Sequence, residues 1–105
     1  MLIYHITTRQ EWLSQKPLGI YTPSGYAQDG FIHCSTSAQI WEVANHYYFN
    51  RHDLVVLEID STRLNTKVIF ENLEGGADLF PHLYEKLPVA AVTSVRTLFV
   101  GDERV

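Results

Sequence analysis

The chain has 105 residues, of which 46% are hydrophobic and 19% are charged, and its formal net charge is −4. This length and composition predict a globular protein with a single domain over residues 1–105. A negative chain lacks the clustered Lys and Arg of a broad nucleic-acid surface, although a few contacts can hold a small nucleotide. No apolar run approaches the roughly 20 residues of a membrane span, so we expect no membrane partner.

The single cysteine, Cys34, cannot form a disulfide within the chain. The N-terminal residues lack the basic and apolar regions of a signal peptide. Together these features predict a cytoplasmic protein. Nothing in the sequence indicates the oligomeric state.

The chain opens with a predicted strand over residues 2–6, and a helix follows directly. Thr8 and Glu11 have the spacing of a capping box, in which the two side chains bond backbone N–H groups of the first helical turn. We therefore expect a helix over residues 9–15, which Pro17 ends because proline disfavours helix at the residue before it.

The stretch over residues 31–35 reads as a short strand with one polar ring in its middle. Alternation along a strand places Ile32 and Cys34 on one face and His33 on the other. If the face with Ile32 and Cys34 packs into the core, His33 faces a groove or the solvent.

A second capping box, formed by Thr36 and Gln39, predicts a helix over residues 38–48 with an apolar stripe of helical period. The N-terminus of this helix, with Ser35 and Thr36 beside it, is suited to anion binding. The alternative is that these hydroxyls only cap the helix.

The remaining elements follow from alternation, apolar runs and turn residues. Residues 54–60 form the strongest strand, and its apolar first half predicts burial on both faces. Pro81 marks its segment as an edge strand or no strand, since proline cannot donate to a ladder. The other expected elements are a short strand at 19–22, a loop at 26–30, a turn at 61–66, a strand at 67–71, a loop at 72–78, an extended segment at 79–84, a turn at 85–88, a long strand at 89–100 and a tail at 101–105. About six strands and two helices, with the helices early and the strands late, predict an α+β fold.

Three of the five histidines, His5, His33 and His82, lie within apolar strand-like runs. Imidazole in such a run has a reason to be there, such as bonding a ligand or moving a proton. The alternative is a core histidine that bonds a backbone carbonyl. His46 and His52 lie in a predicted helix and a loop, where solvent exposure explains them. No pair has the spacing of a common zinc motif, so no metal site is predicted.

Glu71 closes an alternating strand and precedes a glycine-containing loop. It could act as a general base or hold a ribose hydroxyl, and the alternative is a solvated charge at the end of a strand. Cys34 follows His33 and points to the opposite face. We therefore expect a buried, inert thiol rather than a nucleophile.

Three motifs in this order resemble a known family: Ile-Tyr-His-Ile-Thr at residues 3–7, Gly-Phe-Ile-His-Cys-Ser-Thr at 30–36, and Phe-Pro-His-Leu-Tyr at 80–84. They look like the small bacterial family listed as domain of unknown function 952. That family is grouped with the ADP-ribosyltransferase-like folds, and the resemblance implies a split, mostly antiparallel sheet around an NAD-binding cleft.

Parts of the wider pattern can be placed on this chain. Residues 4–7 are similar to the first-strand His-Gly-Thr motif, whose His holds the adenosine ribose, although Ile6 replaces the Gly. Residues 31–48 are similar to the second motif, in which an aromatic residue, serines and a helix follow one another. His33 stands near the aromatic position.

The resulting hypothesis is an α+β domain whose cleft binds a nucleotide or NAD-related ligand as substrate and acts as a glycosyltransferase of the ADP-ribosyl-transfer type. The expected catalytic residues are His33, His82 and Glu71. The expected ligand-binding residues are His5, Thr7, Ser35 and Thr36. Two alternatives remain open: a non-catalytic small-ligand sensor, and a structural interaction protein whose histidines are satisfied internally.

Overall fold

A computed structural model describes residues 1–73 and 75–101. Residue 74, in the expected loop, and residues 102–105, in the expected tail, lie outside the described residues. In chain order the elements are β1 (Leu2–Thr8), α1 (Arg9–Gln15), η1 (Lys16–Leu18), β2 (Ile20–Tyr21), α2 (Tyr26–Asp29), β3 (Ile32–His33), α3 (Ile40–Tyr47), β4 (Leu54–Asp60), η2 (Ser61–Arg63), β5 (Ile69–Glu71), β6 (Phe80–Leu83), β7 (Leu87–Pro88), η3 (Val89–Ala91) and β8 (Val92–Leu98).

The strands of the described part form three small antiparallel sheets, ordered β1-β4-β8, β2-β7 and β3-β6-β5. A backbone bridge between Tyr4 and Ser35 joins the first sheet to the third. The α+β prediction is confirmed. The expected six strands are eight in the described chain: the extended segment at 79–84 forms β6, and the expected turn at 85–88 contains β7, whose two residues carry no alternation to detect.

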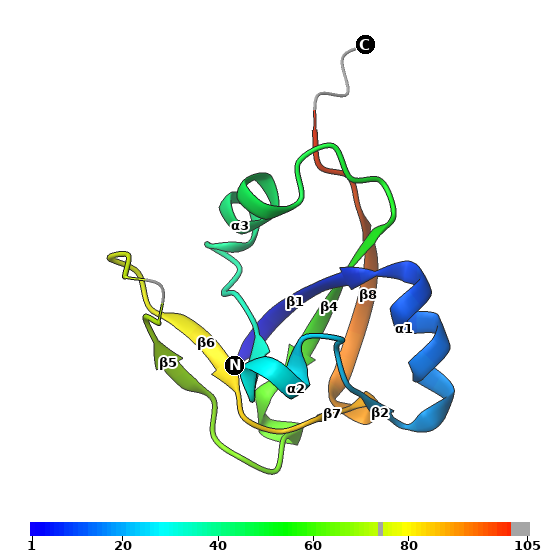
Figure 1. The fold of residues 1–105 in the computed structure, drawn as a ribbon. Helices are drawn as coiled ribbons and strands as arrows, with labels where there is room; N and C mark the ends of the chain where they lie inside the picture. The colour runs from blue at the N-terminus through cyan, green and yellow to red at the C-terminus, as the bar shows by residue number, and fades with distance from the viewer. Residues whose placement is uncertain (74, 102–105) are drawn as a thin grey trace.

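The two longest α-helices lie on opposite faces of the β1-β4-β8 sheet (Figure 1). Trp12 of α1 packs in the cluster that holds Val55 and Leu57 of β4, and Ala44 of α3 packs in the cluster that holds Leu54. Burial on both faces of β4 is therefore confirmed. Fully burying an aliphatic side chain of this size stabilises the fold by about 1.5–3 kcal/mol, so β4 is the main anchor of the core.

The prediction that Pro81 lies at an edge or outside a strand is wrong, because β6 is the middle strand of its sheet. The Pro81 carbonyl accepts a bond of 3.0 Å from the Cys34 N–H, but proline has no N–H to return it. Only that one rung of the ladder is weakened. As a result, β3 ends at His33, one residue before this pair.

The expected loop at 26–30 contains the short helix α2. Gly30 closes it with φ of 78°, a left-handed conformation suited to glycine, and its N–H bonds the Tyr26 carbonyl. The expected strand at 89–100 begins as η3, and only Val92–Leu98 pairs with β4.

Helix α3 begins at Ile40, not at 38, and Thr36 is not its N-cap. Half of the expected capping box forms: the Thr36 N–H donates to the Gln39 side chain at 3.0 Å. The Thr36 carbonyl accepts from the N–H groups of Gln39 and Ile40, so residues 37–39 form a turn before the helix. Within the described residues no helix is long and apolar enough to cross a membrane.

Candidate functional site

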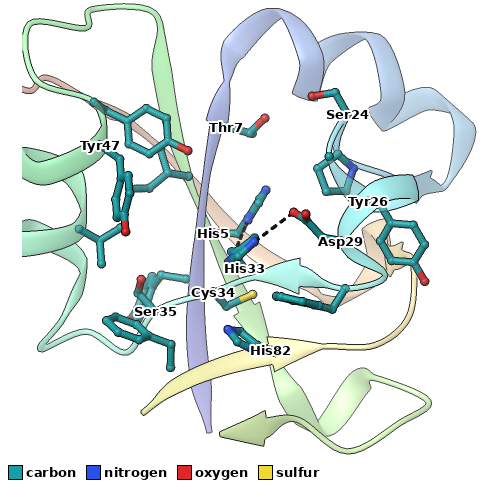
Figure 2. A pocket seen from close by; sticks show the side chains of 18 of the residues that line it. His5, Thr7, Ser24, Tyr26, Asp29, His33, Cys34, Ser35, Tyr47 and His82 are labelled. Carbon is teal, nitrogen blue, oxygen red and sulfur yellow. Dashed lines mark hydrogen bonds and ion pairs between the residues drawn. The ribbon is translucent and has the colours of Figure 1, made fainter. Parts of the chain in front are cut away.

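A cleft of about 610 Å³ opens between β1, the segment around α2, the β3-β6-β5 sheet and α3. Figure 2 shows Tyr47 approaching from α3 on one side, Asp29 and Ser24 on the other, and His33 between them. The volume lies in the usual range for small-molecule sites. The lining includes the predicted residues His5, Thr7, His33, Ser35, Glu71 and His82. Thr36 is not part of it.

Strand register brings two of the histidines together. β3 and β6 are antiparallel, and His33 lies directly opposite His82, with ring centroids 5.5 Å apart. Phe31 packs against both rings, at 4.6 Å from His33 and 4.2 Å from His82. The opposite face of β3 carries the buried Ile32 and Cys34, as the alternation predicted. The core thus fixes which way the histidines face.

His82 forms a buried pair with Glu71 at the base of the cleft. Nδ1 of His82 lies 2.9 Å from Oε1 of Glu71, and their side chains are 5% and 25% exposed. The Tyr84 hydroxyl donates to the same carboxylate oxygen. These hydrogen bonds, first from Tyr84 and then from His82, lower the pKa of Glu71, so it stays ionised. The bond to Glu71 raises the pKa of Tyr84.

His33 forms a second imidazole–carboxylate pair at the mouth of the cleft. Its Nε2 lies 3.1 Å from Oδ2 of Asp29, the last residue of α2, and the side chains are 54% and 43% exposed. Figure 2 shows this bond as a dashed line. The two pairs therefore differ in depth: one is covered and the other is open to solvent.

Four atoms of these pairs have no hydrogen-bond partner among the described residues: His33 Nδ1, Asp29 Oδ1, His82 Nε2 and Glu71 Oε2. No buried side-chain nitrogen or oxygen in the described part lacks a partner, so His82 Nε2 must reach the accessible surface despite the burial of its ring. A carboxylate can only accept, which places the proton of each neutral ring on the nitrogen facing its carboxylate. All four atoms are then hydrogen-bond acceptors.

His5 has a different environment. Its Nδ1 lies 2.7 Å from the His33 carbonyl oxygen, which can only accept, so Nδ1 carries the proton. Its Nε2 lies 3.1 Å from the Tyr21 hydroxyl, whose oxygen is 2.8 Å from Thr7 Oγ1. Burial lowers the pKa of His5 from 6.5 to about 4, so the ring is neutral. Both nitrogens are used within the protein, and the ring holds β1 against β3.

The chain of contacts continues from Thr7 Oγ1 to Oε2 of Glu11, 3.3 Å away, and the other Glu11 oxygen accepts from the Ser24 N–H. Burial raises the pKa of Tyr21. This chain connects β1, α1 and β2 and fixes the segment that enters α2. It therefore supports Asp29 indirectly.

Among the lining residues that the structure describes, four carry a formal charge at neutral pH: the carboxylates of Glu11, Asp29 and Glu71, and the guanidinium of Arg51. Arg51 forms a bidentate pair with Asp53, with N–O distances of 2.8 and 2.7 Å. The cleft is thus rich in acceptors and poor in cations. No group of three or more potential metal-binding side chains occurs in the described part of the chain.

Asp29 and Tyr21 were not singled out from the sequence, and Glu11 was predicted only as a helix-capping residue. Asp29 precedes His33 by four residues, but residues 26–30 gave no helical signal that would have made this spacing meaningful. Tyr21 meets His5 only through the tertiary fold. Cys34 is buried, and burial raises the pKa of its thiol to about 12, which agrees with the inert role expected for it.

Comparison of the chain with known protein families identifies the class of the protein. Residues 6–95 match the family described as protein of unknown function DUF952, and the chain belongs to that family. No curated protein matches the chain.

The chain is also similar to protein CC0527 from Caulobacter crescentus. A crystal structure of that protein is 35% identical, with a TM-score of 0.82, and covers 93% of this chain and 86% of that one. The crystal structure of a double methionine variant gives 34% identity and the same TM-score and coverage. Its solution NMR structure gives 36% identity, a TM-score of 0.80, and coverage of 93% and 84%.

Proposed function

We propose that the cleft binds a ribose-containing ligand of the NAD or ADP-ribose type and that the chain transfers the ribosyl group from its nitrogen base. This proposal places the fold among the ADP-ribosyltransferase-like folds. The short antiparallel sheets that surround one cleft support that placement.

The observation that carries the proposal is a pair of free acceptors at the base of the cleft, His82 Nε2 and Glu71 Oε2. Acceptors need donors, and the hydroxyls of a ribose are closely spaced donors. A ligand recognised mainly through phosphate would need several cations or N–H donors instead. Among the charged lining residues Arg51 is the cation, which suits a pyrophosphate at the open end of a ligand held by its riboses.

Glu71 is the candidate for the chemical step. Cleavage of a ribosyl–nitrogen bond develops positive charge at the anomeric carbon, and a fixed carboxylate beside it stabilises that charge. Tyr84 and His82 hold Oε1 of Glu71 and leave Oε2 toward the ligand. Phe31, His33 and His82 form an aromatic wall beside it.

In this proposal His5 and Thr7 act by positioning the strands that carry the cleft, since both nitrogens of His5 are already bonded. Ser35 has a buried side chain in the lining, where its hydroxyl can reach a ligand. The α3 residues in the lining, Val43 and Tyr47, come from the middle and the C-terminal end of that helix, so its N-terminus does not provide the phosphate site.

The test has two readouts on the same purified chain. Thermal shift with NAD, ADP-ribose and adenosine measures binding, because a ligand of the native state raises the melting temperature. Release of nicotinamide from NAD measures transfer. We expect a shift with ADP-ribose and NAD, and slow nicotinamide release that the Glu71→Gln variant loses.

The matched control is Glu42→Gln, which removes an exposed carboxylate of α3 outside the cleft. Binding that Glu71→Gln weakens, without nicotinamide release from the wild-type chain, would favour the sensor alternative. No response to any of the three ligands would favour the structural alternative and refute the proposal.

A further inference from the structure

His33 lies at the mouth of the cleft, and its imidazole ring is hydrogen-bonded to Asp29. Binding of the ribosyl group beside Glu71 does not require this ring. His33 is 54% exposed and Asp29 is 43% exposed, whereas His82 and Glu71 are 5% and 25% exposed. A group arriving from solvent therefore meets His33 first. A ribosyl group bound beside Glu71 would lie deeper, next to the ring of His82.

The proton position on His33 follows from its partner. The Asp29 carboxylate lies 3.1 Å from Nε2 and can only accept, so Nε2 carries the hydrogen and Nδ1 carries the lone pair. Nδ1 has no partner in the described part of the chain. A carboxylate that fixes the tautomer of an accessible imidazole is the arrangement by which enzymes prepare a general base.

We propose that His33 is the general base for the acceptor of the transfer reaction, that Asp29 is its positioning residue, and that the acceptor is an O–H nucleophile. This inference rests on the proposed ribosyl transfer and deepens it by naming the acceptor class. Imidazole can take a proton from water or an alcohol as attack proceeds. It cannot deprotonate a guanidinium, which stays charged in proteins, so an arginine acceptor is excluded.

The step balances without an additional reagent. The bond between the ribosyl C1′ and the nitrogen of the cationic base breaks, and its electron pair leaves on the now neutral base. The acceptor oxygen forms the new C1′–O bond, and its proton passes to His33 Nδ1 and then to solvent. Glu71 remains ionised throughout and faces the charge that develops at C1′.

Two variants separate the base from its positioning residue. We expect His33→Asn to lower the turnover number for nicotinamide release about 100-fold with the KM for NAD unchanged, since general-base catalysis contributes about 10²–10⁴-fold. Asp29→Asn should lower turnover less, because the ring remains but its tautomer is no longer fixed. The controls His52→Asn and Glu42→Gln change exposed residues outside the cleft and should leave both constants unchanged.

A measurement without ligand checks the positioning role separately. Nitrogen NMR of the histidine rings above neutral pH should show His33 with its hydrogen on Nε2, and Asp29→Asn should give a mixture of tautomers. Full turnover in His33→Asn, or a wild-type ring with its hydrogen on Nδ1, would overturn the assignment. Nicotinamide release by the wild-type chain that His33→Asn retains in full overturns this inference alone, whereas a wild-type chain that releases no nicotinamide overturns the proposed transfer as well.

Discussion

Replacing His5 with Asn should remove a large part of the acid sensitivity of this fold. In an asparagine the amide nitrogen takes the place of ring Nδ1, so His5→Asn keeps a donor for the His33 carbonyl. The contact of Nε2 with the Tyr21 hydroxyl is lost. We expect the variant to be about 1–2 kcal/mol less stable at neutral pH, the usual cost of one buried hydrogen bond and its unsatisfied partner.

The stability advantage of the wild-type chain over His5→Asn disappears as the pH falls. The pKa of His5 is about 4 in the native chain, against an ordinary value of 6.5, because burial disfavours the charged ring. Between these values the unfolded chain binds a proton that the native chain does not, so stability falls as the pH falls through 6.5 toward 4. Between about pH 7 and about pH 4.5 this difference costs the wild-type chain about 2 kcal/mol, at about 1.4 kcal/mol for each pKa unit.

Urea unfolding at these two pH values measures the effect. The free energy of unfolding should fall by about 2 kcal/mol more for the wild-type chain than for His5→Asn, since all carboxylates are common to both proteins. His52→Asn, at an exposed site, should behave like the wild-type chain. Equal losses in the wild-type chain and His5→Asn would show that His5 is not a neutral, buried ring and would refute the reasoning.

Three further outcomes follow from single contacts. Tyr21→Phe removes the hydroxyl between His5 and Thr7, so His5 Nε2 loses its partner. Urea unfolding should show a free energy of unfolding about 1–3 kcal/mol lower than that of the wild-type chain, and an unchanged value would contradict this. Burial raises the pKa of the Cys34 thiol to about 12, so a thiol reagent should label the native chain only at the rate of its unfolding, and rapid labelling would contradict the burial. Arg51→Met should lower the affinity for ADP-ribose, measured by calorimetry, about tenfold and leave the affinity for adenosine unchanged. An equal effect on both ligands would show that Arg51 does not contact the phosphates.

The features that the sequence predicted well depend on neighbours along the chain. Half of the capping box of α1 forms, with the Glu11 N–H bonded to Thr8 Oγ1 at 3.0 Å and the helix over Arg9–Gln15 as expected. The Glu11 carboxylate accepts from the Ser24 N–H instead of the Thr8 N–H. Alternation placed Ile32 and Cys34 in the core because period 2 is a property of any strand. The continuous apolar run of β4 likewise indicated burial on both faces.

The features that the sequence missed depend on contacts between distant residues. Pro81 is tolerated in a central strand because the rung it weakens lies one residue beyond the end of β3, which no local pattern reveals. The three strand histidines looked alike in sequence, yet the fold gives them different partners. His5 bonds a backbone carbonyl, whereas His33 and His82 bond carboxylates and each keep one nitrogen free.

The account depends most on the claim that Glu71 Oε2 and His82 Nε2 are acceptors for a ribosyl group. Calorimetric titration of ADP-ribose into the wild-type chain and into Glu71→Gln tests it most directly. The account predicts measurable binding to the wild-type chain and an affinity about tenfold lower or more for the variant, since one charge-assisted hydrogen bond contributes about 1.5–3 kcal/mol. Equal affinities, or no heat of binding to the wild-type chain, would contradict it.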